Sequence, residues 1–73
     1  MNKKNKIKIT VNGKQMTVKL KFSLKNLIEK LELPIGKVAI ELNKEIVNKK
    51  KINIMFLKNG DKIEIVHFIG GGL

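Results

Sequence analysis

The carboxyl end of the chain carries the residues that could do chemistry. Gly70, Gly71 and Gly72 stand together before Leu73, directly after an apolar run. Glycine loses more conformational freedom on folding than any other residue and adds no side chain to a core, so fold stability gives no reason for this run. A backbone without Cβ atoms can instead pass through a narrow cleft. We expect a flexible tail that presents a terminal carboxylate to another protein's active site; the alternative is a disordered end or a cloning remnant.

The rest of the composition argues against an enzyme. The chain has 73 residues, no cysteine and one histidine, His67. It therefore has no nucleophilic thiol, no disulfide and no thiolate metal site, and no Ser/His/Asp constellation is evident. We interpret His67 as a structural residue. A protein of this kind would bind no cofactor or metal of its own, and any chemistry on it would be done by partner enzymes.

The net charge of +10 comes from 16 lysines, with no arginine. Arginine makes the bidentate contacts to bases, and a stacking platform needs more aromatic side chains than the three phenylalanines present here. We therefore expect a solvated basic surface and no specific nucleic-acid binding. No apolar stretch approaches the roughly 18 residues that a membrane helix needs, and the start does not resemble a signal peptide. These features predict a cytoplasmic protein with no membrane partner.

The N-terminal half predicts a hairpin and one helix. Apolar and polar residues alternate over 7–11 and 16–22, and Asn12-Gly13 between them is a tight-turn signal. Ser23 can then cap an amphipathic helix of about ten residues, a usual length in globular proteins. The apolar residues of that helix follow the i, i+3, i+4, i+7 spacing, and Pro34 and Gly36 serve as stop signals: Leu24, Leu27, Ile28 and Leu31.

The C-terminal half predicts more strands. Residues 38–42 form the third, a turn over 43–45 leads to Ile46-Val47, and a polar connection and the apolar run 52–57 follow. After a turn over 58–61, residues 62–69 form the last strand. The order is β-β-α-β-β-β, which predicts an α+β domain over residues 1–69, with a mixed four- to five-stranded sheet covered on one face by a single main helix, and a tail over 70–73.

Period two assigns faces to the strands. If Ile63 and Ile65 of the last strand face the core, Val66 and Phe68 point to the opposite side, where they would form an apolar patch for a partner. The alternative is that a loop or a bulge covers them. The expected core is Ile7, Ile9, Val11, Val18, Leu20, Leu27, Ile28, Leu31, Val38, Ile40, Leu42, Phe56, Ile63 and Ile65.

Two segments carry a family resemblance. The run VAIELNKEIV over 38–47 and the run NGDKIEIVHFIGGG over 59–72 resemble the ThiS family, the ubiquitin-like sulfur carriers of thiamin biosynthesis, and ITVNGK over 9–14 is similar to it as well. The resemblance implies a ubiquitin-like β-grasp fold, in agreement with the element order. It also implies that Gly72 is the residue modified, while Gly70 and Gly71 thread the partner's active site.

The mechanism implied by this resemblance places all catalysis in partners. An E1-like adenylyltransferase (ThiF-like) would use ATP to adenylate the Gly72 carboxylate, and a sulfur donor system such as a cysteine desulfurase would supply the sulfur of a thiocarboxylate. The carrier would deliver that sulfur to a thiazole synthase (ThiG-like). Two alternatives stay open, namely a MoaD-like carrier for molybdopterin synthesis and a basic β-grasp module that binds RNA or a protein surface.

Leu73 departs from the family pattern, in which glycine is the last residue. A branched side chain at the reactive carboxylate would not fit a channel shaped for glycine. We interpret Leu73 as the first residue of a tag, so that the native chain would end at Gly72. The other interpretation is a native leucine that must be trimmed.

Overall fold

The computed structural model of the chain describes residues 5–68. A five-stranded mixed sheet has the strand order β2-β1-β5-β3-β4. The last strand in sequence, β5, therefore lies in the middle of the sheet. It pairs in parallel with β1 and antiparallel with β3. The elements in chain order are β1 (Lys6–Val11), β2 (Lys14–Lys19), α1 (Leu24–Lys30), η2 (Ile35–Lys37), β3 (Val38–Leu42), β4 (Glu45–Ile46), η3 (Lys49–Ile54) and β5 (Lys62–His67).

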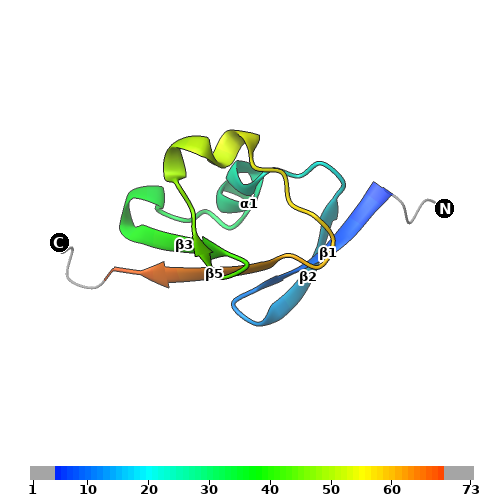
Figure 1. Cartoon of the computed structure of the whole chain (residues 1–73), viewed down its shortest axis with the longest axis horizontal. Coiled ribbons are helices and arrows are strands. Elements are labelled where there is room, and N and C mark those ends of the chain that lie inside the picture. Colours follow the sequence, from blue (N-terminus) through cyan, green and yellow to red (C-terminus); the bar gives the residue numbers. More distant parts are fainter. Residues whose placement is uncertain (1–4, 69–73) are drawn as a thin grey trace.

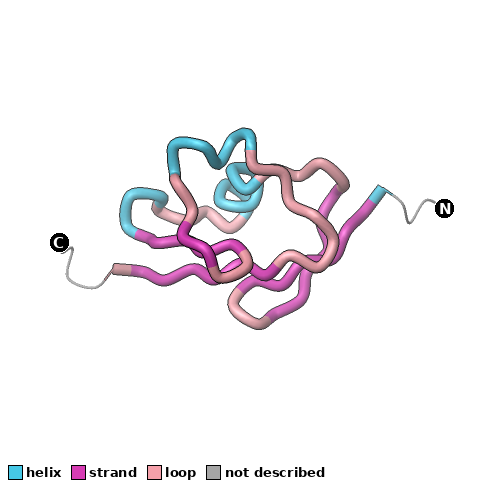
Figure 2. The backbone as a smooth tube through the Cα atoms, viewed as in Figure 1, coloured by secondary structure: helices cyan, strands magenta, loops and turns pink. Residues whose placement is uncertain are grey.

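One face of the sheet is covered and the other is open. Helix α1 and the 3-10 helix η3 lie on the same side of the sheet, and this second layer encloses the core (Figures 1 and 2). Burying one helix and one sheet face against each other gives a short chain a single shared core. The predicted α+β architecture and the order β-β-α-β-β-β are confirmed. The buried core is Ile7, Ile9, Val18, Leu24, Leu27, Ile28, Val38, Ile40, Val47, Leu57, Ile63 and Ile65.

Two tight turns build the hairpins on either side of β5. Asn12 and Gly13 join β1 to β2 with φ angles of 49° and 84°, and Asn43 and Lys44 join β3 to β4 with 52° and 72°. Positive φ at both central residues matches the right-handed twist of the flanking strands, and asparagine and glycine adopt it most readily. The first hairpin turn is as predicted.

Helix α1 begins at a capping box. The Ser23 Oγ accepts a hydrogen bond from the Asn26 backbone N–H at 3.0 Å, and the Asn26 Oδ1 accepts one from the Ser23 N–H at 3.0 Å. Two N–H groups that the helix cannot satisfy are thereby paired. The predicted role of Ser23 is confirmed.

The helix is shorter than predicted, with 7 residues. Its chain reverses at Glu32, which has a φ of 53°, well before Pro34. The Glu32 N–H donates to the Glu29 carbonyl at 3.1 Å and the Leu33 N–H to the Ile28 carbonyl at 3.0 Å. This is the Schellman pattern of helix ends, formed without glycine. Because Leu31 lies beyond the last helical residue, it is exposed, and its assignment to the core was wrong.

Two other core assignments were also wrong, each for a local reason. Strand β2 ends at Lys19 and the chain turns at Lys21, whose φ is 65°, so Leu20 leaves the covered face and is exposed. Phe56 pairs with Ser23 in an isolated β-bridge, and in this extended stretch the side chain of Leu57 points inward while that of Phe56 is exposed. The core gains Leu24, Val47 and Leu57, which the prediction omitted, whereas Val11 and Leu42 only pack against it half-buried.

Two predictions concern the C-terminal end of the chain, namely the length of the last strand and the tail. Strand β5 ends at His67, so the predicted strand over 62–69 is too long at Phe68, and Ile69 lies outside the described residues. The predicted tail over 70–73, with Gly70, Gly71 and Gly72, lies outside them as well. Over residues 5–68, no helix has the length and apolar character needed to cross a membrane.

Candidate functional site

The candidate site is the end of β5, the strand that leads toward the glycines. Ile63 and Ile65 point into the core and fasten the strand to the covered face. Strand β3 runs along it in a register that joins Val38 to His67 and Leu42 to Ile63. The pairing extends one residue further, because the Phe68 N–H donates to the Lys37 carbonyl at 2.9 Å. A strand held in the middle of a sheet is a rigid base for whatever follows it.

On its other side, β5 outlasts its partner β1, and Asn12 continues the pairing. Strand β1 ends at Val11, after which the Asn12 N–H donates to the Ile63 carbonyl at 2.9 Å. The Asn12 side chain then acts as one more peptide group. Its Oδ1 accepts from the Ile65 N–H at 2.7 Å, and its Nδ2 donates to the Ile65 carbonyl at 3.3 Å. The turn residue of the first hairpin thus holds the exit of β5 by two side-chain hydrogen bonds.

Asn43 holds the start of β5 in a similar way. Its N–H donates to the Lys62 carbonyl at 2.8 Å, and its Oδ1 accepts from the Lys62 N–H at 2.9 Å. The Asn43 Nδ2 also donates to the Asp61 Oδ1 at 3.0 Å, and the Asp61 Oδ2 accepts from the Lys58 N–H at 2.8 Å. Both hairpin turns therefore clamp the same strand, one at each end.

The apolar patch predicted beside the tail is exposed. The exposed fraction is 59% for Val66 and 41% for Phe68. Val66 lies opposite Ala39 of β3 on the open face of the sheet. The Lys49 Nζ lies 5.5 Å from the centroid of the Phe68 ring and donates to the Ile35 carbonyl at 2.8 Å. This cation–π contact ties the ring to the ends of η2 and η3 and leaves much of it open.

Sequence reasoning found part of this site. Val66 in β5 and Phe68 just after it are exposed as expected, and their role toward a partner stays a prediction. It missed Asn12 and Lys49. Asn12 was read only as a turn residue, and its bond to Ile65 spans 53 positions, which local pattern cannot show. The only feature of the sequence that could have pointed to Asn12 was the positive φ that an Asn-Gly turn requires.

The described residues bring together no chemistry of their own at this end. His67 is exposed, and no group of three or more histidine, cysteine or acidic residues in the described ranges could hold a metal ion. What the fold positions is the backbone: a central strand, clamped by two asparagines, leading to the three glycines.

A mixed sheet of five strands covered by one main helix, with the last strand in the centre, defines a ubiquitin-like β-grasp protein. The ThiS family model matches residues 5–72. A crystal structure of a thiamine biosynthesis protein (ThiS) from Geobacter metallireducens superimposes with a TM-score of 0.79 and 32% identity, covering 90% of this chain and 100% of that one. The chain belongs to the ThiS family.

The relatives that match include a sulfur carrier and thiazole synthases. The sulfur carrier protein ThiS of Bacillus subtilis is 37% identical over 65 residues, which cover 88% of this chain and 98% of that protein. A thiazole synthase of Paramagnetospirillum magneticum is 38% identical over 66 residues, or 90% of this chain. The matched segment spans only 20% of the length of that synthase. A thiazole synthase of Magnetococcus marinus matches to the same extent.

Proposed function

We propose that this protein is a sulfur carrier of thiamin biosynthesis and that, in a chain without Leu73, the Gly72 carboxylate is the group that carries the sulfur. The carboxylate oxygen attacks the α-phosphorus of ATP in an E1-like adenylyltransferase (ThiF-like), and pyrophosphate leaves. The persulfide of a donor such as a cysteine desulfurase then displaces AMP from the acyl adenylate, and a thiol reduces the resulting acyl disulfide to release the thiocarboxylate. The thiocarboxylate that results donates its sulfur to a thiazole synthase (ThiG-like). The carrier itself acts as a substrate and needs no bound cofactor.

The observation that carries this proposal is the match to the Bacillus subtilis sulfur carrier, which extends over 98% of that protein. The family model reaches residue 72, so the match includes the glycines. The thiazole synthases support the acceptor: a segment resembling this chain occurs within proteins of that name. Two proteins that work together are often found joined in one chain elsewhere. These relatives favour a thiazole acceptor over the molybdopterin alternative.

The geometry at the end of β5 suits this role. A carboxylate becomes a good electrophile only when its oxygen is made a leaving group, and the partner does this inside its own active site. The carrier must therefore deliver a thin backbone and offer a surface to grip. Val66 and Phe68, the last described residue, are both exposed, and we propose them as the surface that the adenylyltransferase binds.

The test uses a chain ending at Gly72, incubated with an E1-like enzyme, ATP and a sulfur donor, and read by intact mass. We expect a species in which sulfur replaces one terminal oxygen. The variant Gly72→Val should fold and remain unloaded, because a branched side chain blocks the channel. Gly36→Val is the matched control, since a side chain at Gly36 meets open space. Equal loading of both variants would refute the role of Gly72, and no loading of the unchanged chain would refute the carrier proposal.

A further inference from the structure

The outer edge of β2 is open. In the strand order, β2 is outermost and pairs only with β1 among the described residues. The Leu20 N–H donates to the Asn5 carbonyl at 2.8 Å, which makes this pair a hydrogen-bonded one. Hydrogen-bonded pairs alternate with non-bonded pairs along an antiparallel ladder. Counting back in the observed register, Gln15, Thr17 and Lys19 direct their N–H and C=O groups away from β1.

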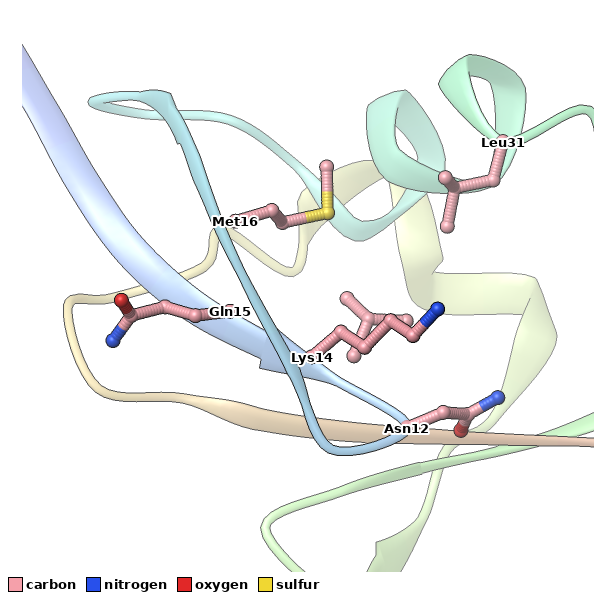
Figure 3. Close-up of a pocket in the computed structure, with 6 residues that line it drawn as sticks. Asn12, Lys14, Gln15, Met16 and Leu31 are labelled. Atoms are coloured by element: carbon pink, nitrogen blue, oxygen red, sulfur yellow. The ribbon is translucent and has the colours of Figure 1, made fainter.

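Two hollows lie between this edge and the layer of α1, and together we call them the groove. One hollow of about 460 Å³ is lined by residues of β1, β2 and the end of α1, among them Met16 and Leu31. Figure 3 shows these two side chains pointing toward one another across it, with Lys14 at its border and Gln15 on the other side of the strand. A second hollow of about 340 Å³ follows further along β2, where Val18 and Phe22 supply apolar surface.

The charge around the edge has one sign. The two hollows include Lys14 in the first and Lys6, Lys19 and Lys30 in the second, and neither has an acidic residue in its lining. Lys6 lies directly opposite Lys19 in the register of β1 and β2. Like charges placed opposite each other in a sheet destabilise it. A third hollow on the open face, lined in part by Lys6 and Lys8, continues the basic surface.

We propose that the edge of β2 binds an extended segment of a partner protein in which acidic and apolar residues alternate. The segment adds a sixth strand to the five of the sheet through the outward groups of Gln15, Thr17 and Lys19. Its side chains alternate between the two faces. The apolar ones enter the groove beside Met16 and Leu31, and the acidic ones meet the lysines on the open face.

Lysines on an edge strand also discourage unwanted pairing, so charge alone would not indicate a binding site. The apolar hollows make the difference. Met16 is half-buried and Leu31 exposed in a groove that nothing in the described chain fills, whereas an edge built only to repel needs no apolar lining. Charge complementarity selects an acidic occupant, and the apolar floor selects one with alternating apolar side chains.

This surface is separate from the end of β5. Strand β1 lies between β2 and β5 in the sheet, and none of the residues lining the two hollows is Val66 or Phe68. A partner that holds the tail would leave the edge of β2 accessible. The inference therefore does not depend on sulfur transfer, and a chain carrying Gly72→Val should bind the segment unchanged.

The probe is a capped ten-residue peptide of alternating aspartate and valine, titrated into the isotope-labelled protein by NMR. The amides of Gln15, Thr17 and Lys19 should shift and then exchange more slowly with solvent, and binding should weaken with added salt. The control peptide has the same composition, with its aspartates and valines in two separate blocks, and should bind at least about tenfold more weakly. Equal binding of both peptides would overturn the proposal.

Two variants at one position separate strand addition from simple attraction between charges. Thr17→Pro removes an outward N–H group, and an edge strand tolerates proline at such a position. This variant should bind the alternating peptide about tenfold more weakly. Thr17→Val keeps the N–H and should bind like the unchanged protein. If Thr17→Pro folds and binds equally well, the contact is not a strand addition. If the three outward amides are already protected in the free protein, another part of this chain occupies the edge, and the proposal is wrong.

Discussion

Replacing Asn12 by glycine should loosen the end of β5 without disturbing the turn. Glycine adopts the φ of 49° without strain, so the change removes only the side chain and its two hydrogen bonds to Ile65. Each such bond contributes about 0.5–1.5 kcal/mol net, which predicts a loss of about 1–3 kcal/mol. A domain of this size has a core worth only about 3–5 kcal/mol, so the loss is a large share of its stability.

Asn43→Gly is the matched control for this change. Asn43 has nearly the same φ, 52°, and it clamps the start of β5 through solvent-exposed hydrogen bonds instead of part-buried ones. Water competes for exposed groups, so we expect Asn43→Gly to cost less. Urea unfolding measures both; with a slope of about 1 kcal/mol/M, Asn12→Gly should lower the midpoint by about 1–3 M.

Hydrogen exchange gives the local readout. The Ile65 amide faces the side where β1 has ended and donates to Asn12, whereas the Val66 amide faces β3 by the alternation of the ladder. In Asn12→Gly the Ile65 amide should lose its protection while that of Val66 stays protected. If both amides stay equally protected, or if Asn43→Gly costs as much as Asn12→Gly, the argument for a clamp at the exit of β5 is wrong.

Three further outcomes are expected. Ser23→Ala should destabilise the fold by about 1 kcal/mol in urea unfolding, because it removes the capping box, and no change in the midpoint would contradict the cap. Glu32→Gly should raise stability by about 1 kcal/mol, since glycine relieves the left-handed conformation at the end of α1; a loss of stability would show that the Glu32 side chain matters more than its backbone. Phe68→Ala should weaken binding to an E1-like enzyme, measured by calorimetry, while Phe56→Ala, which removes another exposed ring, should not; equal effects would remove Phe68 from the partner surface.

Local patterns in the sequence predicted the framework well. The Asn12-Gly13 turn, the Ser23 cap and the alternation of the strands each follow from contacts within a few residues, and all three are present. The wrong core assignments occur where a shift of one residue decides whether a side chain points into the core or to the surface. In the run 52–57, a 3-10 helix ends at Ile54, and the extended stretch after it turns Leu57 inward and Phe56 outward. In an unbroken apolar run, no alternation of apolar and polar residues shows which side chains face the core.

The site was predictable only in its exposed part. Period two placed Val66 and Phe68 on the side opposite Ile63 and Ile65, and both are exposed. The clamp by Asn12 depends on where β1 stops relative to β5, a matter of register between strands that lie more than fifty positions apart. The end of α1 at Glu32 was hidden for another reason: a left-handed helix end normally contains glycine, and here it does not.

The central place of β5 has a consequence for the order of events during synthesis. Of the described elements, β5 is made last, yet it is the only one that joins the β1–β2 hairpin to the β3–β4 pair. Until it inserts, the sheet exists as two separate halves, and closing it requires contacts between distant parts of the chain, which are slow to form. Only Phe68 and Ile69 stand between this strand and the first glycine, Gly70. A partner that binds the end of β5 would therefore bind only completely folded chains. Unfinished or misfolded chains would not be bound, and no ATP would be consumed on them.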